Sequence, residues 1–267
     1  MRTPQSEVLK ALCGCGVRKV RWIGAIEIDK LRSGYFLRSN MGVVTVLTTQ
    51  ASTHHLTSCG ESLHLSAHRT AYSPIHKALF VADVHLGKAA TFRRLGVPVP
   101  AGTTQANLSR LSAAIAQFDV QALYFLGDLL HAKAAHNPSL LAALADWRQH
   151  HAHIHMALVR GNHDSRAGDP PADLNIAVVE EPFALGGFAL CHHPQQVHGA
   201  LALAGHEHPV VRMEGKGRDR ARLPCFVRRD ALLVLPSFGE FTGGHAVETN
   251  SGDEIIPVLP VHDLITC

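Results

Sequence analysis

Several short apolar runs in this chain end abruptly in polar residues that can bind metals or catalyse reactions. The first run, 79–82, is followed by Asp83 and His85. Runs of four to eight apolar residues that are closed by polar turns indicate buried strands of an α/β protein. Open α/β sheets bind their ligands beyond the carboxyl ends of the strands. The residues after each run are therefore candidate functional residues.

Three further runs end in the same way. They lie at 122–126, 154–159 and 201–204, and they are followed by Gly127-Asp128, by Gly161-Asn162-His163-Asp164 and by Gly205-His206-Glu207-His208. A lone Asp-x-His or Gly-Asp pair is at least as often a turn cap or a satisfied core residue as a functional site. Four such clusters, each directly after an apolar run, make coincidence the weaker interpretation and predict one shared site.

The segments between the first three runs have the periodicity of helices. Leu108, Leu111, Ile115 and Phe118 recur at three- and four-residue spacing, which predicts an amphipathic helix over 104–118. A second helix is predicted over 139–150, and this alternation of strands and helices predicts βαβ crossovers with largely parallel pairing. After Pro182 the predicted strands are short and the helices are few, which predicts a second sheet. We expect an α/β fold, a four-layer αββα sandwich of two mixed sheets flanked by helices.

The first 57 residues differ from the rest of the chain. Residues 1–40 carry eight Lys or Arg and three acidic residues, whereas the remaining chain carries 17 and 19. The formal net charge of +3 therefore reflects the N-terminal piece and indicates no basic face on the rest of the protein. We predict an N-terminal extension of unknown role over 1–57 and a globular domain over 58–267. A flexible extension and a translation start at Met41 are two open interpretations of the first segment.

The composition excludes some classes of protein. With 267 residues and 46% hydrophobic residues, the chain can bury one sizeable core. Its apolar runs are shorter than the about 20 residues that a membrane helix needs. The N-terminus lacks the apolar region of a secretory signal, so we expect a cytoplasmic protein with no membrane partner. The six scattered cysteines favour reduced thiols over a disulfide framework.

The side chains in the clusters form a coherent set of metal ligands. They are carboxylates, imidazoles and one amide, which suit Mn, Fe, Co or Zn in a catalytic site better than a structural zinc site. They are too many for one tetrahedral ion but suffice for two ions about 3.5–4 Å apart that share a carboxylate. The candidate residues are Asp83, His85, Asp128, Asn162, His163, His192 or His193, His206 and His208.

The order of these clusters resembles that of the calcineurin-like metallophosphoesterases, and the resemblance extends from about Gly60 to the C-terminus. Within that superfamily, segments 82–88 and 127–131 resemble the DNA-repair nuclease branch. Closer still, segments 94–104, 190–194, 222–226 and 236–244 resemble the bacterial ligase-associated DNA-damage-response endonucleases.

The resemblance implies a role for each residue of the set. One metal would be held by Asp83, His85 and His208, the other by Asn162, His192 and His206, and Asp128 would bridge them. A hydroxide shared by the metals would attack phosphorus, and His163, oriented by Asp164, would assist the leaving oxygen. Manganese is the expected metal, with Fe, Co or Zn as alternatives. Strand alternation directs only one of His192 and His193 inward, and the place of His192 after Leu190-Cys191 favours it.

A basic segment follows the last cluster. Seven Lys or Arg lie between 212 and 229, against two acidic residues. Arg218, Arg220 and Arg222 are candidates for binding a phosphate backbone. A solvated hairpin rim is an alternative of equal weight.

We expect a two-metal phosphodiesterase. The resemblance implies a DNA endonuclease in DNA repair, with DNA as a partner and with a DNA ligase and helicase-like repair proteins as associates. One alternative is a small-molecule phosphodiesterase that acts on cyclic nucleotides. Another is a metal-dependent nucleic-acid-binding scaffold without turnover. The intact ligand set argues against the scaffold, because a scaffold needs no attacking hydroxide.

Overall fold

The computed structural model of the protein describes residues 27–31, 34–39, 42–46, 53–99, 102–214, 220–240, 242–248 and 250–259. It describes the side chains of these residues except those of 27–46, 213, 214, 220 and 221. Two large mixed sheets and a small antiparallel sheet make up its β-structure.

The first large sheet has seven strands in the order β10-β9-β8-β7-β6-β5-β4. Strands β7 to β10 pair in parallel, whereas β4 to β7 pair antiparallel. The parallel half confirms the predicted crossovers, and it places the polar residues after β7, β8 and β9 at one edge. The strands are β4 (Thr53–Ser58), β5 (Glu61–Ser66), β6 (Thr70–Ser73), β7 (Ala78–Val81), β8 (Ala122–Leu126), β9 (His155–Val159) and β10 (Ile176–Val179).

The second sheet has the order β11-β12-β13-β16-β15-β14-β17, and β18 pairs with β15. Its central strands β12, β13 and β16 are parallel, so the ends of β12 and β13 also point to one edge. The strands are β11 (Phe183–Leu185), β12 (Phe188–Leu190), β13 (Leu201–Ala204), β14 (Pro209–Glu214), β15 (Arg220–Arg229), β16 (Leu232–Val234), β17 (His245–Ala246) and β18 (Glu254–Pro257).

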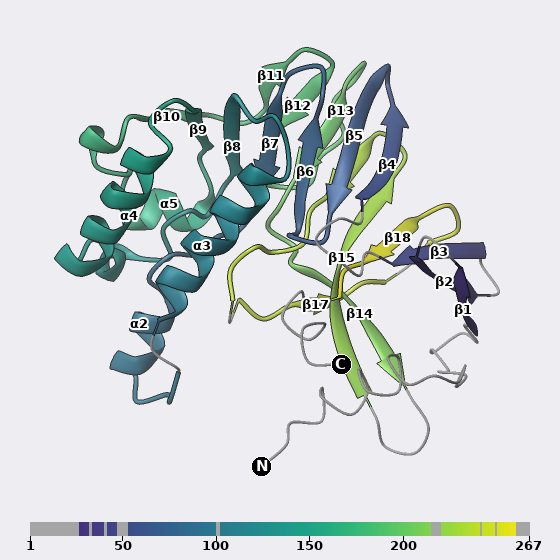
Figure 1. The fold of residues 1–267 in the computed structure, drawn as a ribbon, viewed down its shortest axis with the longest axis horizontal. Coiled ribbons are helices and arrows are strands. Elements are labelled where there is room, and N and C mark those ends of the chain that lie inside the picture. Colours follow the sequence, from purple (N-terminus) through teal and green to yellow (C-terminus); the bar gives the residue numbers. More distant parts are fainter. Residues whose placement is uncertain are drawn as a thin grey trace.

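The helices lie beside the seven-stranded sheet (Figure 1). They are α2 (Lys88–Arg94), α3 (Thr103–Ala116), α4 (Pro138–His150) and α5 (Asn162–Ala167), with short 3₁₀ turns η1 (Lys133–Ala135) and η2 (Ala172–Leu174). The predicted helices are confirmed as α3 and α4, whereas α2 and α5 were not predicted. Within the part of the chain that is described, no helix is long and apolar enough to cross a membrane.

Three layers of apolar side chains hold the fold together. Leu108 and Leu144 of the helices pack on Leu79, while Phe80 and Leu203 pack between the two sheets. The α/β class with two mixed sheets and flanking helices is confirmed. Among the described residues the outer face of the second sheet is covered by partly buried side chains of strands and loops, where we expected a fourth, helical layer. These are Val197, Ala200, Val211, Val247 and Ile255.

The N-terminal segment contains structure of its own. Strands β1 (Glu27–Leu31), β2 (Gly34–Ser39) and β3 (Gly42–Val46) form an antiparallel sheet, and β3 lies beside β18 (Figure 1). Strand β4 begins at Thr53 and pairs with β5 along its whole length. Residues 53–57, which we expected in the extension, therefore belong to the seven-stranded sheet.

Candidate metal centre

The loops after β7 and β8 run side by side at the carboxyl edge of the seven-stranded sheet. The amide of His85 donates to the carbonyl of Asp128 at 2.8 Å, which continues the parallel pairing beyond the strands. Asp83, His85 and Asp128 have φ angles of 55°, 49° and 55°. Such left-handed conformations are costly for residues with a side chain and cluster at functional sites. Here they turn polar side chains into the gap between the sheets' edges.

The first group of candidate ligands consists of Asp83, His85 and His208. The Nε2 atoms of His85 and His208 lie 3.2 Å apart, and Nε2 of His208 lies 3.4 Å from Oδ1 of Asp83. His208 follows β13 with a φ of 46°, so the second sheet supplies it. Both Asp83 and His85 are buried. Two strands of different sheets thus bring these three donors together.

The second group lies around one carboxylate oxygen of Asp128, Oδ1. Nε2 of His192 lies 2.9 Å from Oδ1 of Asn162, 3.1 Å from Nδ1 of His206 and 3.7 Å from Oδ1 of Asp128. The other oxygen of Asp128, Oδ2, lies 3.6 Å from Nε2 of His85 in the first group. Asp128 therefore lies between the two groups, where a shared ligand has to be.

The atoms that converge in the two groups are hydrogen-bond acceptors, which favours the binding of cations. Nδ1 of His192 lies 3.1 Å from the carbonyl oxygen of Leu126, so this nitrogen carries the proton and Nε2 offers a lone pair. That lone pair faces the oxygens of Asn162 and Asp128, which are acceptors too. Oδ1 of Asp83 is buried and accepts no hydrogen bond from the described residues. Hydrogen-bond acceptors that converge without a donor between them are stabilised by a divalent ion. A metal-ligating histidine usually donates its other ring N–H to a group such as a backbone carbonyl, as His192 does here.

Burial keeps the histidines in the state that binds metals. It lowers the pKa of His85, His192 and His206, and the positive charge of Lys88 lowers that of His85 further. Burial also raises the pKa of Asp128, to which the charge of Asp83 adds. Neutral imidazoles are available as ligands, whereas the two buried carboxylates require positive charge nearby.

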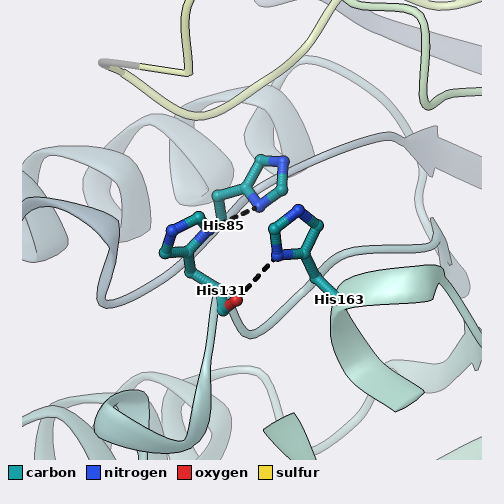
Figure 2. A group of neighbouring side chains, drawn as sticks. All are labelled: His85, His131 and His163. Atoms are coloured by element: carbon teal, nitrogen blue, oxygen red, sulfur yellow. Dashed lines mark hydrogen bonds between the residues drawn. The ribbon is translucent and has the colours of Figure 1, made fainter. Parts of the chain in front are cut away.

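His163 lies at the edge of the first group, at the start of α5 (Figure 2). Its Nε2 is 4.0 Å from Oδ2 of Asp128, and its Nδ1 is 2.8 Å from the backbone carbonyl oxygen of His131. The expectation that Asp164 orients His163 is corrected. The buried carboxylate of Asp164 accepts backbone N–H groups of Gly161, Asp128 and Leu130 at 3.0, 2.7 and 3.1 Å. Asp164 thus fixes the backbone of the Asp128 loop.

His131, the last residue of segment 127–131, lies beside the first group. Figure 2 shows its ring next to His85, and the two Nδ1 atoms lie 3.3 Å apart. If Nε2 of His85 ligates a metal, its Nδ1 carries the proton and donates to His131. Burial lowers the pKa of His131 to about 4, and the charges of Lys88 and His163 add to this shift. His131 is therefore a neutral acceptor behind His85.

His192 and His193 differ in burial. His192 is buried with its ring in the second group, whereas His193 is exposed and its Nδ1 lies 2.6 Å from Oε1 of Glu181. Oε2 of Glu181 accepts the backbone N–H groups of His192 and His193 at 2.6 and 2.9 Å. Sequence reasoning missed Glu181, because it lies far from every motif and precedes β11.

The three candidate phosphate-binding arginines are placed only in part. Arg218 and the side chain of Arg220 lie outside the described residues. Arg222, on β15, is exposed and donates to the carbonyl of Gly244. The Gly244 segment precedes β17, so Arg222 ties the β14–β15 hairpin to the loop that leads to β17.

The loop after β16 donates hydrogen bonds to the backbone of the first group. Ser237 Oγ and the amide of Gly239 both donate to the carbonyl of Asp83 at 3.0 Å, and the amide of Phe238 donates to that of Ala82 at 2.8 Å. These bonds hold Asp83 in its left-handed conformation. The loop lies within segment 236–244, one of the segments that resemble the ligase-associated endonucleases.

Comparisons with known proteins show which family the chain belongs to. The family model of the calcineurin-like phosphoesterases matches residues 76–216. The chain belongs to the calcineurin-like phosphoesterase family, and it is a metal-dependent phosphoesterase. A solved structure, the nuclease MPE of Pseudomonas putida, is 44% identical; the match covers 76% of this chain and 96% of that one, with a TM-score of 0.68. No curated protein matches the chain significantly.

Proposed function

We propose that the protein is a two-metal phosphodiesterase that cleaves DNA as an endonuclease in DNA repair. The observation that carries the proposal is the likeness to the nuclease of Pseudomonas putida, 44% identical over nearly all of that chain. The geometry adds that the donors expected from four separate motifs converge around Asp128.

We assign the first ion to Asp83, His85 and His208 and the second to Asn162, His192 and His206, with Asp128 shared. Carboxylate, imidazole and amide donors favour manganese, with iron, cobalt or zinc as the other ions that the set accepts. When bound, two such ions would supply positive charge to a phosphoryl group and would activate water as a nucleophile at neutral pH. Four of these ligands, Asp83, His85, Asp128 and His192, are buried, which limits competition from solvent at their donor atoms.

His163 is proposed to act on the leaving oxygen. Its Nδ1 donates to the carbonyl of His131, so Nε2 is the atom left to meet the substrate. Nε2 lies 4.0 Å from Oδ2 of Asp128, so it would lie close to a phosphate bound to ions that this carboxylate holds. There it supplies a proton or positive charge to the departing ester oxygen.

The proposed place of this activity is a cytoplasmic repair complex with a DNA ligase and a helicase-like protein. Support comes from the motif resemblance at 94–104, 190–194, 222–226 and 236–244. A processed DNA end is what a ligase requires, so a nuclease of this kind supplies its substrate. Affinity purification of the tagged chain from its own cells, followed by mass spectrometry, tests the association; recovery without any ligase or helicase contradicts it.

A panel of substrates tests the activity. Manganese-loaded protein is incubated with nicked, gapped and hairpin DNA, with bis-p-nitrophenyl phosphate and with cyclic nucleotides. We expect cleavage of DNA and of the nitrophenyl ester. Turnover of cyclic nucleotides without DNA cleavage would identify a small-molecule phosphodiesterase. Tight DNA binding without turnover by any divalent ion would identify a scaffold.

A single substitution links the activity to the site. Asp128→Ala removes the ligand shared by both ions, so it should abolish turnover of every substrate in the panel. Asp173→Ala is the control, because this exposed carboxylate lies in η2, before β10 and therefore at the sheet edge opposite the site. Near-normal rates of Asp128→Ala would refute the assignment of the metal centre.

A further inference from the structure

An open pocket of about 360 Å³ adjoins the metal centre. Its wall nearest the metals is His206, whose Nδ1 lies 3.1 Å from Nε2 of His192 in the second ligand group. The other walls come from β17, the end of β15 and the residues around them, among which are Pro209, Arg229, Ala246 and Glu248. The pocket therefore lies next to the second ligand group, where the proposed function would bind a substrate phosphate.

The charges in and around the pocket exclude a second phosphate. Glu207 and Glu248 line it, and Asp253 lies behind Arg229. Arg229 is the one cation among the lining residues, and it is engaged by Glu207 at 3.3 Å and by Asp253 at 3.6 Å. An anion would face an excess of negative charge here, so the pocket fits an uncharged group.

The walls suit a flat ring with polar edges. Pro209, Ala246 and Val247 supply apolar surface, and the volume lies at the lower end of the about 300–1,000 Å³ of small-molecule sites. Nδ1 of His245 lies 3.2 Å from the carbonyl oxygen of Glu207, so it carries the proton and leaves Nε2 as an acceptor. Together with the exposed carboxylate of Glu248, this gives a rim of hydrogen-bond acceptors.

We propose that this pocket binds the nucleobase next to the scissile phosphate and favours bases that carry an exocyclic amine. The inference rests on the proposed function and adds a base-specific subsite to it. Cytosine, adenine and guanine present amino donors that Glu248 and His245 can accept, whereas thymine presents carbonyl oxygens and a methyl group. Glu248 and His245 are thus specificity-determining residues.

The test compares single-stranded homopolymers of deoxycytidine and deoxythymidine, each about a dozen nucleotides long. We expect kcat/KM of the manganese-loaded enzyme to favour the deoxycytidine strand by about tenfold, the effect of one hydrogen bond to a charged acceptor. Glu248→Ala should bring this ratio down to about threefold or less, because His245 remains. Asp173→Ala, which removes an equal charge at the opposite sheet edge, should keep the wild-type ratio.

Filling the pocket provides a second variant. Ala246 is exposed on the two-residue strand β17, so Ala246→Trp places an indole in the pocket without disturbing the core. It should raise KM for both strands by about tenfold or more, and an unchanged melting temperature confirms folding. Equilibrium binding of fluorescein-labelled strands to Asp128→Ala, with and without Glu248→Ala, should show the same preference in the absence of cleavage.

The outcomes separate the two proposals. A wild-type ratio within twofold of unity, or a ratio that Glu248→Ala leaves unchanged, overturns the base subsite while the nuclease activity stands. An enzyme that hydrolyses bis-p-nitrophenyl phosphate but cleaves neither these strands nor nicked, gapped or hairpin DNA overturns the proposed function, and the base subsite with it.

Discussion

The ring of His163 is held by the backbone of His131, whose carbonyl oxygen lies 2.8 Å from Nδ1 of His163. The two rings also stack, with centroids 4.8 Å apart and planes inclined by 22°. The side chain of His131 meets His85 at the same time (Figure 2). One residue thus connects the proposed leaving-group histidine with a proposed metal ligand.

His131→Ala removes the ring behind His85 but leaves the carbonyl that orients His163. Since outer-shell partners of ligating histidines contribute about 10–100-fold to metal affinity or activity, the apparent affinity for manganese should fall within that range. Saturating manganese should restore part of kcat, because His163 stays oriented. Calorimetric titration of the metal and rates at increasing manganese measure the two effects.

His150→Ala serves as the control for His131→Ala, because His150 is exposed at the end of α4. It should bind manganese like the wild type. Equal manganese affinity in both variants would show that the bond between His131 and His85 plays no part in holding the metal.

The neighbouring histidines His192 and His193 provide a matched pair. His192→Ala removes a buried ring from the second ligand group, so activity should fall by at least about a hundredfold, as expected when reacting groups are misplaced. His193→Ala removes an exposed ring bound to Glu181 and should cost less than about tenfold. Initial rates on bis-p-nitrophenyl phosphate and metal content measure both. The reverse order of effects would make His193 the ligand.

The site was largely predictable because of one topological property. Asp83, Asp128 and Asn162 each follow a strand of the parallel half-sheet, and such ends meet at one edge. The sequence periodicity that indicates each strand therefore also indicates where its last polar residue lies. His206 and His208 follow the same rule in the second sheet.

The residues that support the ligands were harder to predict. Glu181 acts through both carboxylate oxygens on backbone and ring atoms of a distant loop, and no spacing in the sequence signals such a contact. The resemblance implied that Asp164 orients His163, whereas the helical start of α5 turns its carboxylate toward the Asp128 loop. Strand β4 was missed because its Thr- and His-rich sequence is typical of a linker.

Removal of the metals should destabilise the fold. Asp83 and Asp128 are buried carboxylates, and burial raises the pKa of Asp128, so the ions relieve an unfavourable pair of charges. A ligand at a hundred times its Kd stabilises by about 2.7 kcal/mol, which corresponds to roughly 5–10 °C in a domain of this size. Thermal unfolding with EDTA and with manganese measures the difference. Identical melting curves would exclude a metal centre built from these buried residues.

Gly161→Ala tests how closely the backbone approaches the shared ligand. A Cβ at Gly161 would overlap Oδ1 of Asp128, the same oxygen that accepts the amide of His163 at 2.8 Å. The φ of Gly161 is −95°, which alanine adopts freely, so the cost falls on the position of Asp128. We expect kcat/KM to fall by at least about a hundredfold, since shifts of this kind misalign reacting groups.

Gly199→Ala is the control and should show the opposite pattern. Its φ of 77° strains alanine, but a Cβ there meets open space, so the free energy of unfolding should fall by about 1–2 kcal/mol while activity persists. Rates and urea unfolding of both variants decide the matter, and a fully active Gly161→Ala enzyme would mean that Asp128 tolerates displacement and does not bridge two ions.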